Sequence, residues 1–281
     1  ALSGCTKPVL VIGSQATLEP GQIEELQESV RRLGLPTYLG GMARGLLGKD
    51  DPLQLRHKRG KALKEADLVI IAGFPFDFRL GYGRSINKKS VLISANRSAT
   101  DLKKNRRPTH AFRCDPGRFL KMLASRFTST SQTWRGWFDT LQSREDQRDS
   151  EITAMASDTG EYVNPVTAVQ ALESAMSDDA VMVVDGGDFV ATAAYVVKPR
   201  APLSWLDPGV FGTLGVGGGF ALGAALKHPG KEVWLIWGDG SSAYSLAEFD
   251  TFLRHQLPVI AVVGTDASWA QIAREQVEML G

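Results

Sequence analysis

The chain has 281 residues, of which 43% are hydrophobic and 22% charged, and its formal net charge is +1. This composition fits a globular protein of about two domains and gives no reason to expect a nucleic-acid partner. The two cysteines, Cys5 and Cys114, are too few for a disulfide framework or for a metal site built of cysteines.

The sequence shows neither a membrane span nor a secretion signal. No apolar run approaches the roughly 20 residues that cross a bilayer. The start, ALSGCTKPVLVIG, has no signal-peptide layout and enters a strand pattern almost at once. The end, QIAREQVEMLG, stops within a helical pattern. We therefore expect the chain to be a piece of a longer protein.

The first part of the chain alternates apolar strand patterns with amphipathic helix patterns. Extended segments are predicted over residues 8–14, 36–40, 67–73 and 90–95, and helices over 21–34, 58–66 and 117–127. Strands separated by helices imply crossover connections and a doubly wound parallel sheet. We therefore predict a Rossmann-like α/β domain over residues 1–127.

A connecting segment is predicted over residues 128–164. It opens with serine and threonine and continues with many charges, and its main apolar cluster is Trp134, Trp137 and Phe138. This composition is typical of an interdomain connection that contains one helix held in place by its aromatic side chains.

Residues 165–281 restart the alternation and predict a second doubly wound α/β domain. Helices are predicted over 165–176, 217–226 and 245–256, and three apolar strands end in the turns VVDGGD (183–188), WGDGSS (237–242) and VVGTDASW (262–269). In parallel α/β sheets, ligands bind outside the carboxyl ends of the strands. Neighbouring strand ends would bring these three turns within reach of one ligand.

The turn GDGSS holds Asp239 between two glycines. Gly238 and Gly240 let backbone N–H groups face a ligand, and Ser241 adds a hydroxyl at the start of the next helix. Asp239 alone would repel a phosphate, so the turn suits a phosphate only if a divalent cation such as Mg²⁺ lies between them. The alternative is that Asp239 is an ordinary turn residue or helix cap.

A second acidic residue, Asp266, follows 27 residues after Asp239, across one helix and one strand. This pairing resembles the diphosphate-binding motif of thiamine-diphosphate-dependent enzymes. The resemblance implies thiamine diphosphate and Mg²⁺ as cofactors, with Asp239, Asp266 and the backbone carbonyl of Ser268 as metal ligands.

The second turn departs from the family pattern, which has Asn-Asn where this chain has Thr265 and Asp266. Aspartate is still a hard oxygen ligand for Mg²⁺, but its added negative charge would face the diphosphate. Our hypothesis is that Asp266 makes cofactor binding more dependent on Mg²⁺. If the register differs by one residue, Thr265 is the ligand instead.

The stretch DPGVFGTLGVGGGFALGAAL at 207–226 is similar to the part of these enzymes that grips the aminopyrimidine ring. The resemblance implies that the carbonyl of Gly212 accepts from the ring amine and that Leu214 props the cofactor in a bent form. Taken alone, Leu214 could equally be a core leucine. Gly187 and Asp188 match the turn that touches the diphosphate in the family.

The first domain resembles the central domain of the family, which carries FAD in acetolactate synthases and an ADP portion of coenzyme A in the acyl-CoA lyase branch. The matching segment, AGFPFDFRLGYG at 72–83, lacks a Gly-x-Gly-x-x-Gly turn, so it does not by itself predict a dinucleotide. Arg79 and Arg84 could meet a phosphate or could be solvated surface charges.

Within the family, FGTLGVGGGFALGAA is most similar to 2-hydroxyacyl-CoA lyases and oxalyl-CoA decarboxylases, and GTDASWAQI to acetolactate-synthase-like proteins. The resemblance implies a lyase of fatty acid metabolism that cleaves a 2-hydroxyacyl-CoA to a shortened aldehyde and formyl-CoA. The alternatives are an acetolactate-synthase-type carboligase acting on pyruvate and a degenerate, non-catalytic cofactor-binding domain.

Family enzymes activate the cofactor with a glutamate from a separate pyrimidine-binding domain, which would precede residue 1. The resemblance therefore implies no catalytic residue within this chain, little activity of the chain alone, and a homodimer or homotetramer of the full protein. It also suggests the endoplasmic reticulum membrane, reached only through segments outside this chain, or else the cytoplasm.

Overall fold

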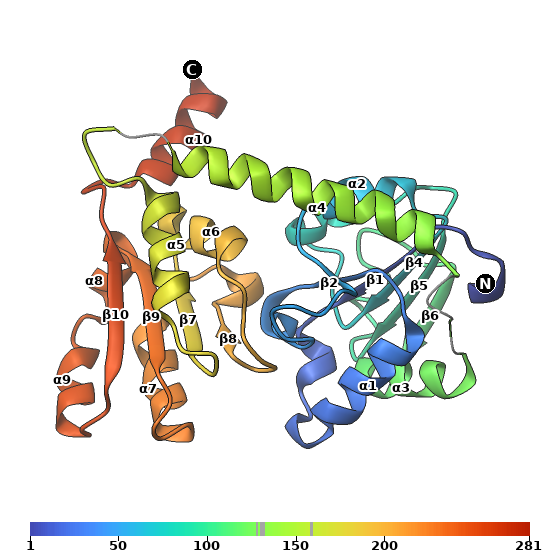
Figure 1. Cartoon of the computed structure of the whole chain (residues 1–281), viewed down its shortest axis with the longest axis horizontal. Coiled ribbons are helices and arrows are strands. Elements are labelled where there is room, and N and C mark those ends of the chain that lie inside the picture. Colours follow the sequence, from blue (N-terminus) through green and yellow to red (C-terminus); the bar gives the residue numbers. More distant parts are fainter. Residues whose placement is uncertain (128, 130–132, 158–159) are drawn as a thin grey trace. The chain divides into compact units, whose positions relative to one another are not determined.

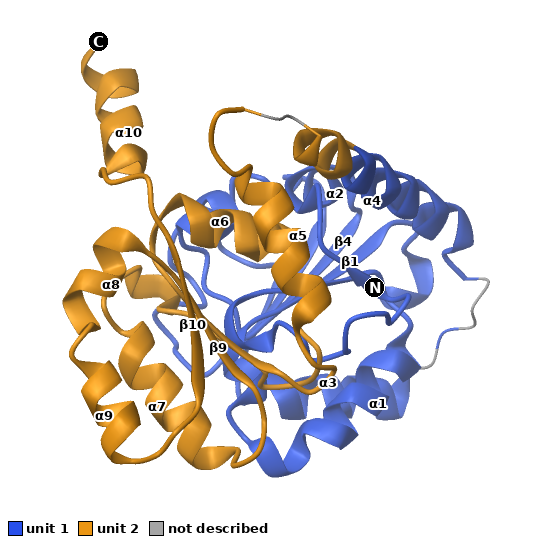
Figure 2. Ribbon diagram, turned by 60° about the vertical axis from the view of Figure 1, so that its left-hand side comes forward, with its two compact units in different colours: residues 1–150 blue, residues 151–281 orange. Residues whose placement is uncertain are grey.

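A computed structural model of the chain describes residues 1–127, 129, 133–157 and 160–281 (Figure 1). The chain forms two compact units, Ala1–Ser150 and Glu151–Gly281 (Figure 2). Each unit is built on a parallel sheet with helices packed against it, which confirms the predicted fold class. The predicted domain boundaries stay predictions, and residues 128, 130–132 and 158–159 of the predicted connection lie outside the described residues.

Unit 1 contains a six-stranded parallel sheet with the order β3-β2-β1-β4-β5-β6. This is the strand order of Rossmann sheets. The order reverses between β1 and β4, and sheets of this kind bind ligands at the point of reversal. The paired residues Ile12 and Ala72, and Ala72 and Ala95, place the ends of the three central strands at one level. The strands are β1 (Pro8–Ile12), β2 (Thr37–Leu39), β3 (Gln54–Leu55), β4 (Leu68–Ala72), β5 (Val91–Asn96) and β6 (His110–Arg113).

Helices cover both faces of the unit 1 sheet, with α1 and α3 on one side and α2 and α4 on the other (Figure 1). β1 and β4 are buried along their whole length, as parallel strands covered on both faces should be. The helices are α1 (Ile23–Leu33), α2 (Arg59–Glu65), α3 (Pro116–Arg126) and α4 (Arg135–Ala156), with 3-10 turns η1 (Leu2–Gly4), η2 (Ser14–Thr17), η3 (Pro20–Gln22), η4 (Gly41–Ala43) and η5 (Phe78–Gly83).

The start of α4 is docked on unit 1 by aromatic side chains, as the composition of the connecting segment predicts. Trp134 and Trp137 are buried. Their indole N–H groups donate to the carbonyl oxygens of Cys5 at 3.1 Å and of Pro8 at 3.0 Å. Leu141, one turn further along α4, is also buried. The spacing of residues 134, 137 and 141 places all three on one face of the helix.

Unit 2 contains a four-stranded parallel sheet with the order β10-β9-β7-β8. Its strands are β7 (Val181–Asp185), β8 (Trp205–Leu206), β9 (Val233–Gly238) and β10 (Val259–Gly264). Its helices are α5 (Pro165–Ala175), α6 (Gly187–Val196), α7 (Gly217–Lys227), α8 (Asp239–Ser245), α9 (Glu248–Arg254) and α10 (Ala270–Leu280), with the 3-10 turn η6 (Gly209–Phe211).

The central strands of unit 2 send alternate side chains into two separate cores. On β9, Trp234 and Ile236 join the core beside α5 and α6, while Leu235 and Trp237 join the core beside α7 and α9. β7 alternates in the same way. This period of two places Asp185, the last residue of β7, on the α7 side of the sheet.

The strands β3, β6 and β8 and the helix α6 were not among the predicted elements, and one predicted helix is divided in two. β6 was not predicted, because all four of its residues are exposed and leave no apolar pattern. α6 begins inside the turn that follows β7, and the single helix expected over 245–256 is the pair α8 and α9, with α8 starting at Asp239. Among the described residues, no helix combines the length and the apolar character that crossing a membrane requires.

Candidate cofactor site

The three turns singled out in the second domain meet at the carboxyl edge of the unit 2 sheet. Gly238 of β9 is paired with Gly264 of β10, and Asp185 of β7 with Trp237 of β9. Each turn therefore begins at the same level, and the residues that follow the paired glycines, Asp239 and Thr265, stand opposite one another.

The Asp239 carboxylate joins the second of these turns to the third. Its Oδ1 accepts a hydrogen bond from the N–H of Gly240 at 2.8 Å. Its Oδ2 accepts from the hydroxyl of Thr265 and from the N–H of Ala267, both at 3.0 Å. Three donors thus converge on one half-buried carboxylate, which anchors α8 to the turn after β10.

Asp266 lies in the same turn but bonds within it. Its Oδ1 accepts from the N–H of Ser268 at 3.0 Å and lies 3.2 Å from the Ser268 hydroxyl. Between them, Ala267 has a left-handed φ of 54°, a conformation that costs a non-glycine residue energy and that directs its N–H to Asp239. The register explains why Thr265 is the residue whose side chain reaches Asp239. Whether Asp266 or Thr265 is a metal ligand stays a prediction.

The donors at this edge suit a hard divalent cation. Two carboxylates, a hydroxyl and backbone carbonyls are the oxygen ligands that Mg²⁺ accepts, usually together with phosphate oxygens and water. Among the residues that the structure describes, no three His, Cys, Asp or Glu side chains gather to hold a metal ion. A cation here would have to share its ligands with a diphosphate, and its binding stays a prediction.

Two of the predicted cofactor residues border open space. Gly187 and Gly212 are exposed, and nothing lies within 4 Å of the position that a Cβ would take on either. Both have left-handed φ values, 81° and 57°, so a side chain is unfavourable at each position. A ligand could approach the backbone closely at both places. Beside Gly187, Asp188 is paired with Arg274 of α10 at 2.5 Å.

Three other predicted residues, Gly238, Gly240 and Ser241, are packed within the GDGSS turn. A Cβ on Gly240 would lie 2.9 Å from the Trp269 ring, and a Cβ on Gly238 would lie 3.3 Å from the carbonyl oxygen of Gly186. The Ser241 hydroxyl is buried and donates to the carbonyl oxygen of Asp185 at 2.5 Å. The predicted contacts of these three residues with a diphosphate stay predictions.

Leu214 packs against the end of β7. Its Cδ2 lies 2.2 Å from the position that a Cβ on Gly186 would take, so only glycine fits there. Leu214 is half-buried, between the open Gly212 and the buried Gly217 that starts α7. This position is compatible with a side chain that presents one surface to a ligand.

The residue that holds this arrangement together, Asp185, was not among the sequence candidates. It is completely buried, and its Oδ2 accepts from the N–H groups of Gly215 at 3.0 Å and Gly217 at 2.7 Å. The signal in the sequence was an aspartate that ends an otherwise apolar strand, VMVVD. Since aspartate also opens ordinary turns, that signal alone does not single it out.

In unit 1, a side chain occupies the place where Rossmann sheets bind a ligand. Phe74, two residues after the end of β4, is 3% exposed. A Cβ on Gly13 would lie 2.7 Å from the Phe74 ring, and a Cβ on Gly40 would lie 2.3 Å from it. The Arg79 guanidinium covers the ring at 4.7 Å and is paired with Asp77 at 2.7 Å. The residues present do not fit a nucleotide diphosphate at this point.

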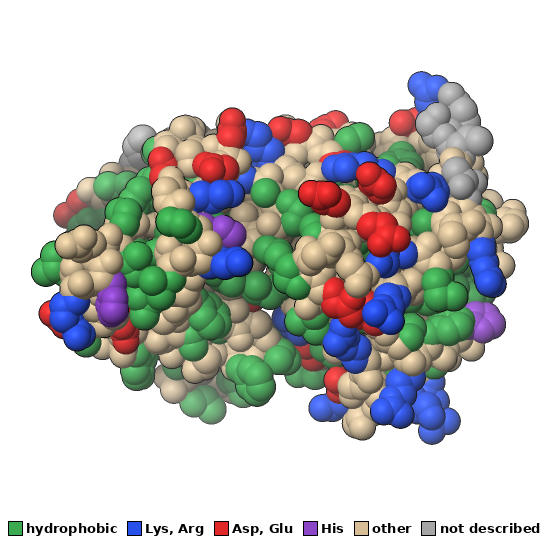
Figure 3. All heavy atoms as spheres, turned by 90° about the horizontal axis from the view of Figure 1, so that it is seen from below, with side chains coloured by type: hydrophobic (Ala, Val, Ile, Leu, Met, Phe, Trp, Pro, Cys, Tyr) green, Lys and Arg blue, Asp and Glu red, His purple; other side chains and the backbone are tan. Residues whose placement is uncertain are grey.

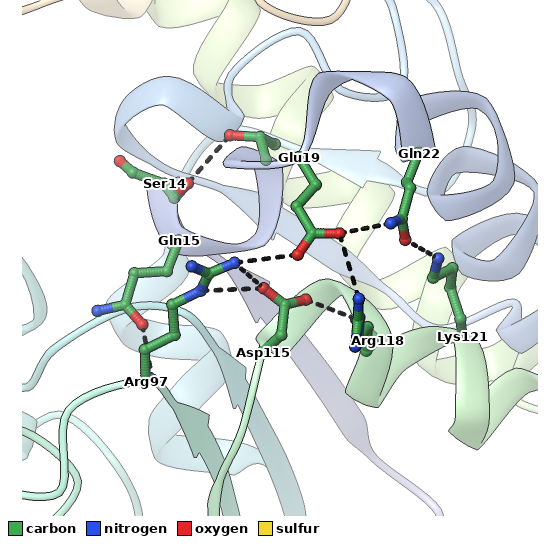
Figure 4. A network of polar contacts seen from close by, with 9 residues as sticks. Ser14, Gln15, Glu19, Gln22, Arg97, Asp115, Arg118 and Lys121 are labelled. Atoms are coloured by element: carbon green, nitrogen blue, oxygen red, sulfur yellow. Dashed lines mark hydrogen bonds and ion pairs between the residues drawn. The ribbon is translucent and has the colours of Figure 1, made fainter.

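A network of polar side chains closes the neighbouring part of the same edge (Figure 4). Arg97, which follows β5, bonds to Asp115 at the start of α3 and to Glu19 at 3.4 Å. Gln22 and Lys121 extend the network, since Gln22 donates to Glu19 and Lys121 donates to Gln22. The charges at this edge are thus satisfied by one another.

Two family sequence models match the chain. The model described as "Thiamine pyrophosphate enzyme, central domain" matches residues 1–123, and the one described as "Thiamine pyrophosphate enzyme, C-terminal TPP binding domain" matches residues 185–281. The chain belongs to the thiamine pyrophosphate enzyme family. This confirms the resemblance found in the sequence and supports thiamine diphosphate (thiamine pyrophosphate) as the cofactor of the family's second domain.

Curated proteins similar to this chain carry two kinds of name. Proteins named 2-hydroxyacyl-CoA lyase 2 are 48% identical over 285 residues in Danio rerio and 50% over 280 residues in Caenorhabditis elegans, covering 100% and 97% of this chain. The acetolactate synthase large subunit IlvG of Mycobacterium tuberculosis is 34% identical over 269 residues, or 95% of the chain. The chain spans 46%, 44% and 48% of these three relatives, about half their length.

Proposed function

We propose that this chain is the cofactor-holding part of a thiamine-diphosphate- and Mg²⁺-dependent lyase that cleaves a 2-hydroxyacyl-CoA to a shortened aldehyde and formyl-CoA. The observation that carries this proposal is the contact of the Asp239 carboxylate with the turn after β10, through Thr265 and Ala267. The family match supports the cofactor. The relatives named 2-hydroxyacyl-CoA lyase 2 support an acyl-CoA as the small-molecule substrate.

The proposal gives the residues of unit 2 distinct tasks. The metal ligands are Asp239, Asp266 and the carbonyl oxygen of Ser268, with Thr265 as the alternative to Asp266. The residues that bind and orient the cofactor are Gly187, Asp188, Gly212, Leu214, Gly238, Gly240 and Ser241. When bound, thiamine diphosphate supplies the electron sink for breaking the carbon–carbon bond. The activating glutamate would come from a separate domain.

An assay of the full protein with 2-hydroxyacyl-CoA and pyruvate offered side by side tests this function. We expect release of the shortened aldehyde and formyl-CoA, dependent on both thiamine diphosphate and Mg²⁺. Consumption of pyruvate without cleavage of the acyl-CoA would instead support an acetolactate-synthase-type carboligase, a reading that the relative at 34% identity favours. Binding of the cofactor with neither reaction would support a non-catalytic domain.

For unit 1 we propose that no FAD or ADP portion of coenzyme A binds at the point where the strand order reverses. The buried Phe74 ring, in close approach to Gly13 and Gly40, supports this proposal. Titration of the full protein with FAD and with ADP, each followed by calorimetry, tests it. Saturable binding that Phe74→Trp abolishes would contradict it, because such binding would depend on this position.

We also propose that the full protein is a homo-oligomer. The face in Figure 3 shows hydrophobic side chains gathered over unit 2 and more charged side chains over unit 1. Several large apolar residues of unit 2 are exposed, among them Phe211 at 89%, Leu253 at 78% and Tyr244 at 67%. Exposed apolar groups of this size are typical of surfaces that meet another protein. Light scattering of the full protein would give a dimer or tetramer mass if the proposal holds.

The proposed compartment rests on the resemblance alone. It is the endoplasmic reticulum membrane, reached through segments outside this chain, or else the cytoplasm. Fractionation of cells that express the full protein, with and without alkaline extraction of membranes, would distinguish the two.

A further inference from the structure

Asp185 is a buried carboxylate at the edge where the proposed cofactor residues meet. Its side chain is 0% exposed, at the last position of β7. Oδ2 accepts two backbone N–H groups, from Gly215 at 3.0 Å and from Gly217 at 2.7 Å. Among the described residues, Oδ1 has no hydrogen-bond partner. No arginine or lysine is paired with it in this part of the structure, so the carboxylate is held by backbone dipoles.

The same residue is bonded to the GDGSS turn through its backbone. Its carbonyl oxygen accepts from the buried hydroxyl of Ser241 at 2.5 Å. Ser241 is in the first turn of α8, two residues after Asp239. The side chain of Asp185 thus fixes the segment before α7, while its carbonyl fixes the start of α8.

The packing around Asp185 leaves little freedom to the segment it holds. A Cβ on Gly217 would lie 2.9 Å from the Cβ of Asp185, so this glycine allows the start of α7 to approach the carboxylate. The next residue, Gly186, has a left-handed φ of 71°, and a Cβ there would lie 2.2 Å from the Cδ2 of Leu214 and 3.0 Å from the Cβ of Ser241. One dipeptide, Asp185-Gly186, therefore touches both halves of the proposed cofactor site.

A carboxylate at this place is costly for folding. Burial raises the pKa of Asp185, and the backbone N–H groups of Gly217, Gly215 and Val216 act against that rise. Hydrogen bonds from N–H groups to an ionised acceptor are shorter and stronger than those between neutral groups. The two backbone N–H groups that donate to Oδ2 hold the segment before α7 in place.

We propose that Asp185 is the positioning residue that sets Gly212 and Leu214 against the diphosphate end of the site. The proposal rests on the proposed lyase function, and it adds a residue that touches neither the metal nor the cofactor. Gly212 and Leu214 lie at the open end of a segment whose other end, Gly215–Gly217, is bonded to Asp185. The start of α8 is bonded to the same residue. A movement of Asp185 would therefore shift both the segment with Gly212 and Leu214 and the start of α8.

The test uses Asp185→Ala and Asp185→Asn in the full protein. We expect Asp185→Ala to weaken thiamine diphosphate binding by about 10- to 100-fold, as loss of an outer-shell partner does at metal sites. kcat at saturating cofactor should fall as well, while KM for the acyl-CoA stays unchanged. Asp185→Asn keeps one oxygen acceptor, so it should restore part of both losses. A purely structural role would lower the folded fraction and leave kcat per bound cofactor at the wild-type value.

Glu232→Gln is the matched control, because Glu232 also accepts a backbone N–H, that of Ser177, but lies at the opposite end of the unit 2 sheet. It should bind cofactor as the wild type does. Hydrogen exchange without cofactor gives a second measurement: the amides of Gly215 and Gly217 should exchange faster in Asp185→Asn and at the wild-type rate in Glu232→Gln.

The result that would overturn the proposal differs from the result that would overturn the proposed function. If the wild type binds thiamine diphosphate and both Asp185 variants match it in affinity and kcat, Asp185 does not position the site. If Asp185→Ala does not fold, the cofactor affinity and kcat of Asp185→Asn decide: wild-type values for both would overturn the proposal. A wild-type full protein that binds no thiamine diphosphate would instead overturn the proposed function itself.

Discussion

The two units are built on the same kind of parallel sheet, yet their carboxyl edges differ. In unit 1 the Phe74 ring fills the reversal point between β1 and β4, and the network around Arg97 and Asp115 satisfies the neighbouring charges. In unit 2 the corresponding edge carries exposed glycines, Gly187 and Gly212, and a carboxylate that reaches across two turns. A shared fold therefore does not imply a shared ligand site.

The difference between the edges comes from the turn at the end of each central strand. After β4, the sequence GFPFD supplies a large apolar ring within two residues of the strand end. After β9, the sequence GDGSS supplies only small and polar groups, and the Asp239 carboxylate stays half-buried. Substitutions at both edges test this contrast, beginning with the largest expected effect.

Phe74→Ala should lower the free energy of unfolding of unit 1 by about 3–5 kcal/mol, because it removes a buried ring and leaves a cavity. Phe78→Ala is the matched control, since Phe78 lies in the same segment but is 55% exposed. It should cost less than about 1 kcal/mol. Urea unfolding followed by circular dichroism measures both. Equal losses for the two variants would mean that Phe74 does not close this edge.

Asp239→Asn and Asp77→Asn compare the acidic residues that follow a central strand in each unit, β9 in unit 2 and β4 in unit 1. Asp239→Asn should weaken thiamine diphosphate binding at fixed Mg²⁺ on the order of 100-fold, because a charged carboxylate ligand is replaced by a neutral amide oxygen. Asp77 is paired with Arg79 in unit 1, so Asp77→Asn should leave cofactor affinity unchanged. Calorimetry of the full protein measures the cofactor affinity of both variants. A loss of affinity in both variants, or in neither, would contradict the proposed difference between the two sheet edges.

Asp266→Asn tests the charge that departs from the family pattern. Removing a negative charge beside the diphosphate should lower the Mg²⁺ concentration needed for half-maximal cofactor binding by roughly tenfold, or about 1.4 kcal/mol. Thr265→Val is the comparison, since it removes the hydroxyl that reaches Asp239. If this Mg²⁺ concentration changes in Thr265→Val but not in Asp266→Asn, Thr265 rather than Asp266 is the metal ligand. Unchanged affinity of Asp266→Asn at every Mg²⁺ concentration would reject the hypothesis.

The sequence predicts an element most reliably where a local apolar pattern determines its structure. β1 and β4 were found because they are apolar along their whole length, and β6 was missed because its residues are exposed. The meeting of Asp239 with the turn after β10 followed from spacing across one helix and one strand. The Phe74 ring against Gly13 and Gly40, and the bond from Asp185 to Gly217, join residues distant in sequence. No local pattern specifies such contacts, so only the folded chain reveals them.

Asp115→Asn should have the smallest effect and tests the closed edge of unit 1 through pH. Burial alone would raise the pKa of Asp115, but the N–H of Arg118 and the side chain of Arg97 hold it below its ordinary value. A carboxyl with a lowered folded-state pKa stabilises the protein above its unfolded pKa of about 4, and that contribution is lost as the pH falls.

At pH 7 the Asp115→Asn variant should therefore be less stable than the wild type by up to about 1 kcal/mol, since asparagine keeps the helix cap but loses the ion pair with Arg97. The difference should close as the pH falls to about 3, and it should shrink in high salt. Urea unfolding at several pH values measures it, with the exposed Asp50→Asn as control. A gap that persists at the acid end would mean that the ionised carboxylate is not its cause, and that the network in Figure 4 is held by packing rather than by charge.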